Sequence, residues 1–190
     1  PKSRVGIWEK IGSLPRALSL QGNAVYQGRI YVVGEYGPWF SGSIVKETYS
    51  APLNSDGTLG AWRAERPLPL PRVPYSTTMA DGKILVSGGF DWEGNWTQDD
   101  SWYSKIQPDG TLGEWTGITL LPQDHQLHHL LAVGNDVFIP GGMRWDLEYP
   151  YAFDFQTVIR SSFLWEDSNP PVTQVRVQGE VGPSGYYVSP

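Results

Sequence analysis

The sequence contains no cysteine, no long hydrophobic run and few stretches with a helical period. Without cysteine the chain has no disulfides, thiolate metal ligands or cysteine nucleophile, although this does not define its compartment. No apolar run reaches the roughly 18 residues that a membrane-spanning helix needs, so we expect no membrane insertion. A net charge of −6 and an isoelectric point near 5.0 argue against nucleic acid and anionic membranes as partners, because both attract basic surfaces.

Glycine, proline and the large aromatic residues are abundant, with 22 Gly, 16 Pro, 9 Trp and 10 Tyr. Short apolar runs such as "RIYVVG", "KILVSGG" and "DVFIPGG" are bounded by Gly, Pro, Asn and Asp. Runs of this length with these boundaries are typical of β-strands. The sequence therefore predicts an all-β fold.

An internal repeat organises the chain. The stretch "DGTLGAW" ends at Trp62, "DGTLGEW" ends at Trp115 53 positions later, and Trp8 lies 54 positions before Trp62. Each Trp is followed by a Leu-Pro proline, then by a turn position, then by a glycine that closes an apolar run. These three sets are Pro15, Pro69 and Pro122; Gly28, Gly82 and Asn135; and Gly34, Gly88 and Gly141. Landmarks that keep register across three copies predict a repeat architecture.

One copy of the repeat reads as four strands. Two apolar runs surround a short turn at Gly28, a variable loop follows, and an Asp-Gly turn at Asp56 or Asp109 joins the third strand to the fourth. Four strands in about 50 residues is the spacing of a propeller blade. We expect Trp62 and Trp115 to pack between neighbouring blades.

At these residues the chain resembles the kelch-repeat propellers. The Gly-Gly after the second strand, the downstream Trp and the Leu-Pro match that family over roughly residues 1 to 145. The Asp-Gly-Thr-Leu-Gly-x-Trp motif resembles that of bacterial secreted or surface kelch-like proteins, which implies an extracellular or cell-surface location. Glu35 replaces the second glycine in the first copy. The family's basic and histidine positions are also degenerate: Leu18, Arg72 and His125 at one, Gln21, Tyr75 and His128 at the other.

The landmarks supply about three four-stranded blades. The predicted units are residues 1–15 as the outer strand of a preceding blade, 16–69 as blade 1, 70–122 as blade 2, and 123–190 as a degenerate blade 3 with a C-terminal extension. After Phe163 no Asp-Gly turn appears, although "PPVTQVRVQGEV" keeps a strand-like alternation. Propellers need about 4–8 blades to close, so this sector is incomplete as a ring on its own.

An incomplete sector would expose sheet edges and apolar blade faces, which soluble proteins usually cover. The chain also begins at Pro1 with neither a start methionine nor a signal peptide. We therefore expect a fragment or subunit, with extensive contacts along residues 1–12 and 150–190. Other protein chains, the remainder of a longer polypeptide, or a second copy would complete the propeller, and the degenerate third repeat favours the first two.

The loops after the Gly-Gly positions are long, differ between copies and share one face of the predicted propeller: "EYGPWFSGSIVKE", "FDWEGNWTQDD" and "MRWDLEYPYAFDF". Binding residues concentrate on loops held by a rigid scaffold. Indoles with nearby carboxylates suit stacking on sugar rings or clamping a protein segment. The candidate ligand-binding residues are Trp39, Asp91, Trp92, Glu93, Trp96, Arg144, Trp145 and Asp146. Alternatively, the aromatic residues fill gaps between blades and the acids keep the loops soluble.

The leading functional hypothesis is a non-enzymatic module that binds protein or carbohydrate through the long-loop face. The alternative is a carbohydrate-active enzyme, such as a glycosidase, a lyase or a relative of sialic-acid epimerases. Acid pairs could serve glycoside hydrolysis, with Arg72 and Arg144 as the basic candidates. Those pairs are Asp91 with Glu93 and Asp99 with Asp100. Galactose oxidase-like chemistry needs a cysteine–tyrosine cofactor, which this chain lacks, and we expect no cofactor or metal.

His125, His128 and His129 form the histidine cluster of the sequence. His128 falls on the family's histidine position, which favours a structural hydrogen bond. On a strand, His128 and His129 would point to opposite faces, and this disfavours a metal site.

Overall fold

The computed structural model describes residues 6–36, 44–91, 97–118, 120–122, 124–134, 136–145, 152–154, 158–162 and 174–178. Over these residues the chain is all-β and contains no helix, as the sequence predicts. Accordingly, nothing in the described part is a helix with the length and hydropathy needed to cross a membrane.

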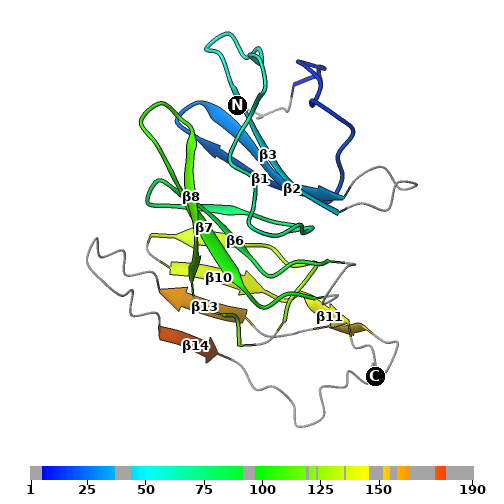
Figure 1. The fold of residues 1–190 in the computed structure, drawn as a ribbon, viewed down its shortest axis with the longest axis vertical. Coiled ribbons are helices and arrows are strands. Elements are labelled where there is room, and N and C mark those ends of the chain that lie inside the picture. Colours follow the sequence, from blue (N-terminus) through cyan, green and yellow to red (C-terminus); the bar gives the residue numbers. More distant parts are fainter. Residues whose placement is uncertain are drawn as a thin grey trace.

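Three four-stranded antiparallel sheets follow one another along the long axis of the molecule (Figure 1). In the first two sheets the strands lie side by side in chain order, which is the meander predicted for a propeller blade. The first blade contains β1 (Gly22–Tyr26), β2 (Arg29–Tyr36), β3 (Ile44–Pro52) and β4 (Arg63–Ala64). The second contains β5 (Thr78–Ala80), β6 (Lys83–Ser87), β7 (Ser101–Ile106) and β8 (Leu112–Ile118).

The third blade has the order β9-β10-β13-β14, interrupted in sequence by a separate hairpin. Its strands are β9 (Leu131–Val133), β10 (Asp136–Pro140), β13 (Val158–Ser162) and β14 (Gln174–Gln178), and the hairpin pairs β11 (Met143–Trp145) with β12 (Ala152–Asp154). The outermost strand β14 comes from the alternating C-terminal stretch. The three sheets together form a partial propeller, and the residue limits of the predicted units stay predictions.

The innermost strands β1, β5 and β9 contact one another in succession. The hydroxyl of Thr77 donates to the carbonyl of Asn23 at 2.7 Å. One repeat later, the amide of Leu130 donates to the hydroxyl of Ser76 at 3.0 Å. Hydrogen bonds at nearly equivalent positions of the repeat therefore join adjacent blades at their inner edges.

Two apolar cores lie between the blades. Because successive side chains of a strand point to opposite faces, β6 contributes Ile84 and Val86 to the core shared with the first blade and Leu85 to the core shared with the third. The buried residues of the first core are Ala24, Tyr31, Val33, Leu68, Ile84, Val86, Ile106 and Leu112. Those of the second core are Leu85, Leu130, Val137, Ile139 and Ile159.

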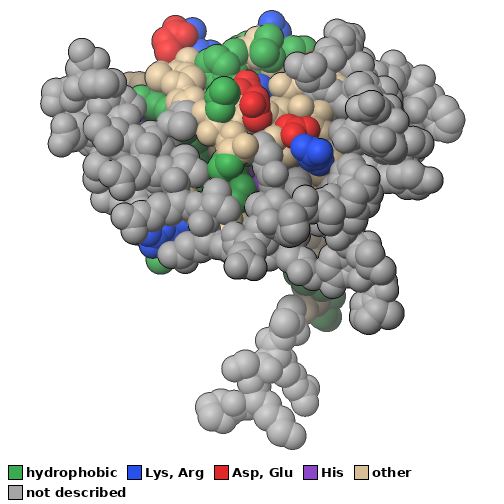
Figure 2. Space-filling view, turned by 90° about the horizontal axis from the view of Figure 1, so that it is seen from below, with side chains coloured by type: hydrophobic (Ala, Val, Ile, Leu, Met, Phe, Trp, Pro, Cys, Tyr) green, Lys and Arg blue, Asp and Glu red, His purple; other side chains and the backbone are tan. Residues whose placement is uncertain are grey.

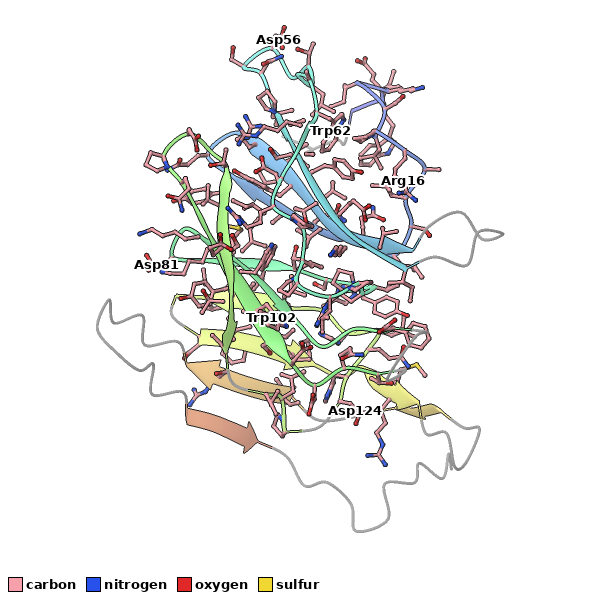
Figure 3. The ribbon with its side chains drawn as sticks, viewed as in Figure 1. Arg16, Asp56, Trp62, Asp81, Trp102 and Asp124 are labelled. Atoms are coloured by element: carbon pink, nitrogen blue, oxygen red, sulfur yellow. The ribbon has the colours of Figure 1, made fainter. Side chains whose placement is uncertain are left out.

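The repeat tryptophans make equivalent hydrogen bonds. The indole N–H of Trp62 donates to the carbonyl of Ser13 at 2.9 Å, and that of Trp115 donates to the carbonyl of Arg66 at 3.1 Å. Trp115 packs against the core between the first and second blades, which confirms its predicted interblade position. Trp62 instead lies beside the segment that precedes the first blade, where Figure 3 also labels Arg16.

The Asp-Gly-Thr part of the motif forms a closed turn. Oδ1 of Asp56 accepts hydrogen bonds from the hydroxyl and the amide of Thr58, at 2.7 and 2.9 Å. Asp109 and Thr111 repeat this arrangement at 2.6 and 2.9 Å. The intervening glycines have positive φ angles, which few other residues adopt without strain. The motif therefore records a turn, in agreement with its predicted role.

Candidate functional site

Neighbouring blades approach each other at the glycine that follows the apolar run of each second strand, Gly34 within β2 and Gly88 directly after β6. A Cβ atom on Gly34 would lie 2.8 Å from the carbonyl oxygen of Arg72, and one on Gly88 would lie 2.5 Å from that of His125. Both glycines have positive φ, +56° and +61°. A glycine is thus required at positions 34 and 88, both by the contact between blades and by the backbone conformation of the residue itself.

Arg72 fixes the segment that leads into the second blade. Its side chain is fully buried and makes a bidentate ion pair with Asp100, at 2.6 and 2.7 Å. The guanidinium also donates to the carbonyl of Gly88 at 3.0 Å, and Asp100 accepts from the indole of Trp102 (Figure 3). Burial opposes ionisation of Asp100. The hydrogen bonds from Arg72, the positive charge of Arg72 and the hydrogen bond from Trp102 outweigh burial and hold the pKa of Asp100 below its ordinary value of 3.8.

This ion pair corrects one part of the enzyme hypothesis. The enzyme alternative included Asp100 as one member of an acid pair and Arg72 as a basic candidate. In the structure, Arg72 and Asp100 form an ion pair with each other, and Arg72 also binds the backbone directly after β6. A guanidinium with no exposed surface does not contact a substrate, so this pair has a structural role.

His125 and His128 are buried between the second and third blades, with ring centroids 5.8 Å apart in an edge-to-face arrangement. Nε2 of His128 donates to the carbonyl of Ser87 at 2.9 Å. Burial, with a smaller contribution from His125, lowers the pKa of His128 to about 4, so the ring is neutral at pH 7. The predicted structural hydrogen bond is confirmed. His129 is exposed whereas His128 is buried, but neither residue lies in a strand, so the predicted opposition of the two side chains on a strand is not tested.

A neutral polar network lies under the loop face. The phenol of Tyr75 donates to Oε1 of Gln126 at 3.5 Å, and Nε2 of Gln126 donates to the hydroxyl of Thr97 at 3.4 Å. Burial raises the pKa of Tyr75 to about 12, which keeps the phenol neutral. The network joins the segments leading into the second and third blades to the end of a variable loop.

Each variable loop begins and ends at paired backbone positions. Tyr36 pairs with Ile44 in the first blade, Phe90 pairs with Thr97 in the second, and Trp145 pairs with Ala152 in the third. Further hydrogen bonds tie Phe90 to Val73 in both directions, at 2.9 and 3.1 Å. We call these three pairs the loop bases. They hold the ends of the loops on the rigid sheets, as binding loops require.

Two of the candidate ligand-binding side chains fall within the described residues. Asp91 directly follows the base residue Phe90. Arg144 lies in β11, 53 residues after Asp91, which is the equivalent position of the repeat. Trp145 is placed in β11 by its backbone alone. The remaining candidates lie outside the described residues: Trp39, Trp92, Glu93, Trp96 and Asp146. The structure describes the loop bases and the two candidate side chains Asp91 and Arg144. The ligand-binding site itself stays a prediction.

The sequence did not reveal the Arg72–Asp100 pair or the Tyr75–Gln126–Thr97 network as units. Arg72 stands at the family's basic position, and a buried arginine needs a carboxylate partner. That signal could have led to the acids directly before β7, Asp99 and Asp100. Within the described part of the chain, no group of three or more potential metal ligands occurs.

Comparison with known proteins agrees with this architecture. No protein-family model matches the chain. Over 118 residues, 61% of its length, the chain is 25% identical to beta-scruin of Limulus polyphemus, a kelch-repeat protein, and this match spans 12% of beta-scruin. The solved structure of YjhT, a kelch-type propeller, has a TM-score of 0.54 and 18% identity, covering 70% of this chain and 37% of that one. The repeats of this chain are kelch-like, and its fold is that of a partial propeller.

Proposed function

We propose that the chain is a protein-binding module that engages its partner through the loops carried by the three loop bases. One observation carries this proposal: three loops of different sequence each start and end at backbone-paired positions, and two of these starting positions, Tyr36 and Phe90, are equivalent in the repeat. A constant frame with variable loops is the arrangement that binding proteins use. The kelch-like relatives support a propeller that binds protein.

The loop composition indicates the chemistry of the partner. Trp39, Trp92 and Trp145 provide large flat surfaces, and Asp91 and Glu93 add negative charge to a chain of net charge −6. Such loops suit a segment with apolar anchors and basic neighbours, because rim charges steer association while buried aromatic anchors supply affinity. Figure 2 shows described hydrophobic, acidic and basic side chains close together on one face, a mixture compatible with a protein partner.

Carbohydrate is the second candidate ligand, because indoles also stack on sugar rings. The four loop tryptophans motivate it: Trp39, Trp92, Trp96 and Trp145. A glycoside-cleaving enzyme would need acids other than Asp100, which is bound to Arg72. The proposal includes an extracellular or cell-surface location, on the basis of the resemblance to bacterial secreted kelch-like repeats.

A display library of random peptides and a glycan array test the proposal together. Peptides selected on the wild-type chain should bind Trp92→Ala and Trp145→Ala at least about 10-fold more weakly, as expected for truncated aromatic anchors. Thr116→Ala, an exposed change on β8, is the matched control and should bind normally. The loop variants should keep their stability within about 1 kcal/mol.

Other outcomes discriminate between the alternatives. Peptides that bind both Trp variants as tightly as the wild type would contradict binding by the long loops. Glycan binding that both variants lose would favour the carbohydrate candidate. Turnover of a glycoside panel that Asp91→Asn abolishes would favour the enzyme.

A further inference from the structure

We propose that the first blade carries a second interaction surface, on the side turned away from the second blade, and that this surface receives one more kelch-type blade. We call it the leading face. It consists of residues that alternate with the core residues along the strands of the first blade, together with the Asp-Gly turn and the repeat tryptophan. Its apolar members are Val25, Ile30, Val32, Leu53, Leu59 and Trp62.

Each member of the leading face has an equivalent in the second blade, 53 or 54 positions later. Those equivalents are Met79, Ile84, Val86, Ile106, Leu112 and Trp115. All six belong to the core between the first and second blades or pack directly against it. The second blade therefore buries against the first blade the same set of positions that the first blade presents on its leading face.

The exposed fractions show what is missing at the leading face. Ile106 is 8% exposed, whereas its equivalent Leu53 is 39% exposed. Val25 is 61% exposed, and its equivalent Met79 is partly buried in the core. Val32 is already buried at 3%, so part of the face is covered. The outer and innermost parts of the face remain exposed apolar surface, which soluble proteins seldom leave uncovered in large patches.

The Asp-Gly turns differ in the same way. The carbonyl of Gly110 accepts a hydrogen bond from the phenol of Tyr31 in the preceding blade at 2.9 Å, and a Cβ on Gly110 would lie 2.6 Å from Cδ of Arg29. Around the equivalent Gly57, no described atom lies within 4 Å of such a Cβ. Figure 3 shows the neighbouring Asp56 at the edge of the molecule. The turn of the second blade thus contacts β2 of the preceding blade. The turn of the first blade has no such strand beside it among the described residues.

Residues 6–11 identify the occupant. Trp8 stands 54 positions before Trp62, and in the second blade the repeat tryptophan lies in the outermost strand, β8. Trp8 is 91% exposed and Ile7 is 92% exposed, and among the described residues the first strand begins only at Gly22. This segment therefore has the landmarks of an outermost strand, and it joins none of the sheets in the described part of the chain.

The segment is nevertheless anchored where the repeat requires. Trp62 binds the carbonyl of Ser13 as Trp115 binds that of Arg66, each 49 positions upstream. The occupant is accordingly a three-stranded antiparallel sheet that residues 6–11 complete to a four-stranded blade. An intact second copy does not fit this description, because its sheets already have the outermost strands β4, β8 and β14.

An extended chain tests the proposal with the protein's own strands. A copy of residues 16–61 is placed directly before Trp8, so that Trp8 takes the position of Trp62 in the added blade. Hydrogen–deuterium exchange should then slow about 10-fold or more in residues 8–11 and in the turn at Gly57, because exchange reports local opening. Binding of an apolar dye should fall. Val25→Arg should leave the original chain unchanged and abolish the added protection in the extended one.

A second extension with residues 70–114 guards against a copy that does not fold. Unchanged exchange of residues 8–11 in both extended chains would overturn the proposal. A dimer of the original chain that protects residues 6–11 by itself would also overturn it, in favour of a second copy as the occupant. Equal protection in the extended chain with and without Val25→Arg would show that the added strands lie elsewhere.

Discussion

Replacing Asp100 by asparagine tests the buried ion pair that holds the second blade at its loop side. The change keeps the size of the side chain and removes its charge. Arg72 would remain with no exposed side-chain surface and would keep its hydrogen bond to the carbonyl of Gly88. Removing one partner of a buried pair costs about 3–5 kcal/mol. Because the side chain of Asp100 is 20% exposed and asparagine still accepts one hydrogen bond, we expect about 3 kcal/mol.

Urea unfolding followed by tryptophan fluorescence measures this cost. Asp99→Asn is the matched control, since the backbone carbonyl of Asp99 accepts a hydrogen bond from the amide of Leu121 at 2.6 Å, and this substitution keeps that bond. The control should change the free energy of unfolding by less than about 0.5 kcal/mol. A loss below about 1 kcal/mol for Asp100→Asn, or equal losses in both variants, would refute the reasoning from burial.

The pH dependence gives an independent check on the same pair. The folded-state pKa of Asp100 lies below 3.8, its ordinary value. The stabilisation is therefore complete above about pH 4 and is lost as the pH falls through the folded-state pKa. Wild type and Asp100→Asn should converge in stability in acid and separate toward pH 7. A constant difference between them at all pH values would contradict this account.

Three further changes test other contacts. Gly88→Ala should cost about 1–3 kcal/mol more than Gly57→Ala, because only at Gly88 would the new Cβ meet a backbone oxygen, that of His125; equal costs in urea unfolding would count against the close approach. The pKa of His128 near 4 predicts a stability loss of about 3 kcal/mol as the pH falls from about 6.5 to 4, and thermal unfolding of His128→Gln should lack it. Trp115→Ala should cost about 3–5 kcal/mol and Trp115→Phe about 1; an unchanged midpoint for both would place Trp115 outside the core.

The repeat landmarks predicted the blades because they encode local geometry. Asp-Gly-Thr specifies a turn, and a glycine at position 34 or 88 specifies a close backbone approach. Even a departure from the pattern has a structural counterpart. Where Glu35 replaces the second glycine, β2 continues and pairs Tyr36 with Ile44. In the second blade, Gly89 has a φ of +111° and β6 ends at Ser87. A residue with a side chain disfavours that conformation, so the chain stays extended.

Long-range pairings could not be read from the repeat. Arg72 and Asp100 are 28 residues apart, and nothing in their spacing fixes the ion pair. The hairpin of β11 and β12 is inserted into the third blade, so the register of the landmarks is lost after Gly141. Loop composition indicated exposed aromatic and acidic residues. It did not indicate that each loop starts at a paired base, because that pairing depends on strands distant in sequence.

The most direct test of the central claim is a hydrogen–deuterium exchange footprint of the chain bound to its tightest selected peptide. The claim is that partners bind on the side of the molecule where Figure 3 labels Asp124, and that the short turns such as Asp81 lie on the opposite side. Slower exchange in residues 35–45, 90–98 and 143–153, with unchanged exchange around Asp81, is the predicted result. A footprint confined to the short turns, with unchanged exchange at all three loop bases, would contradict it.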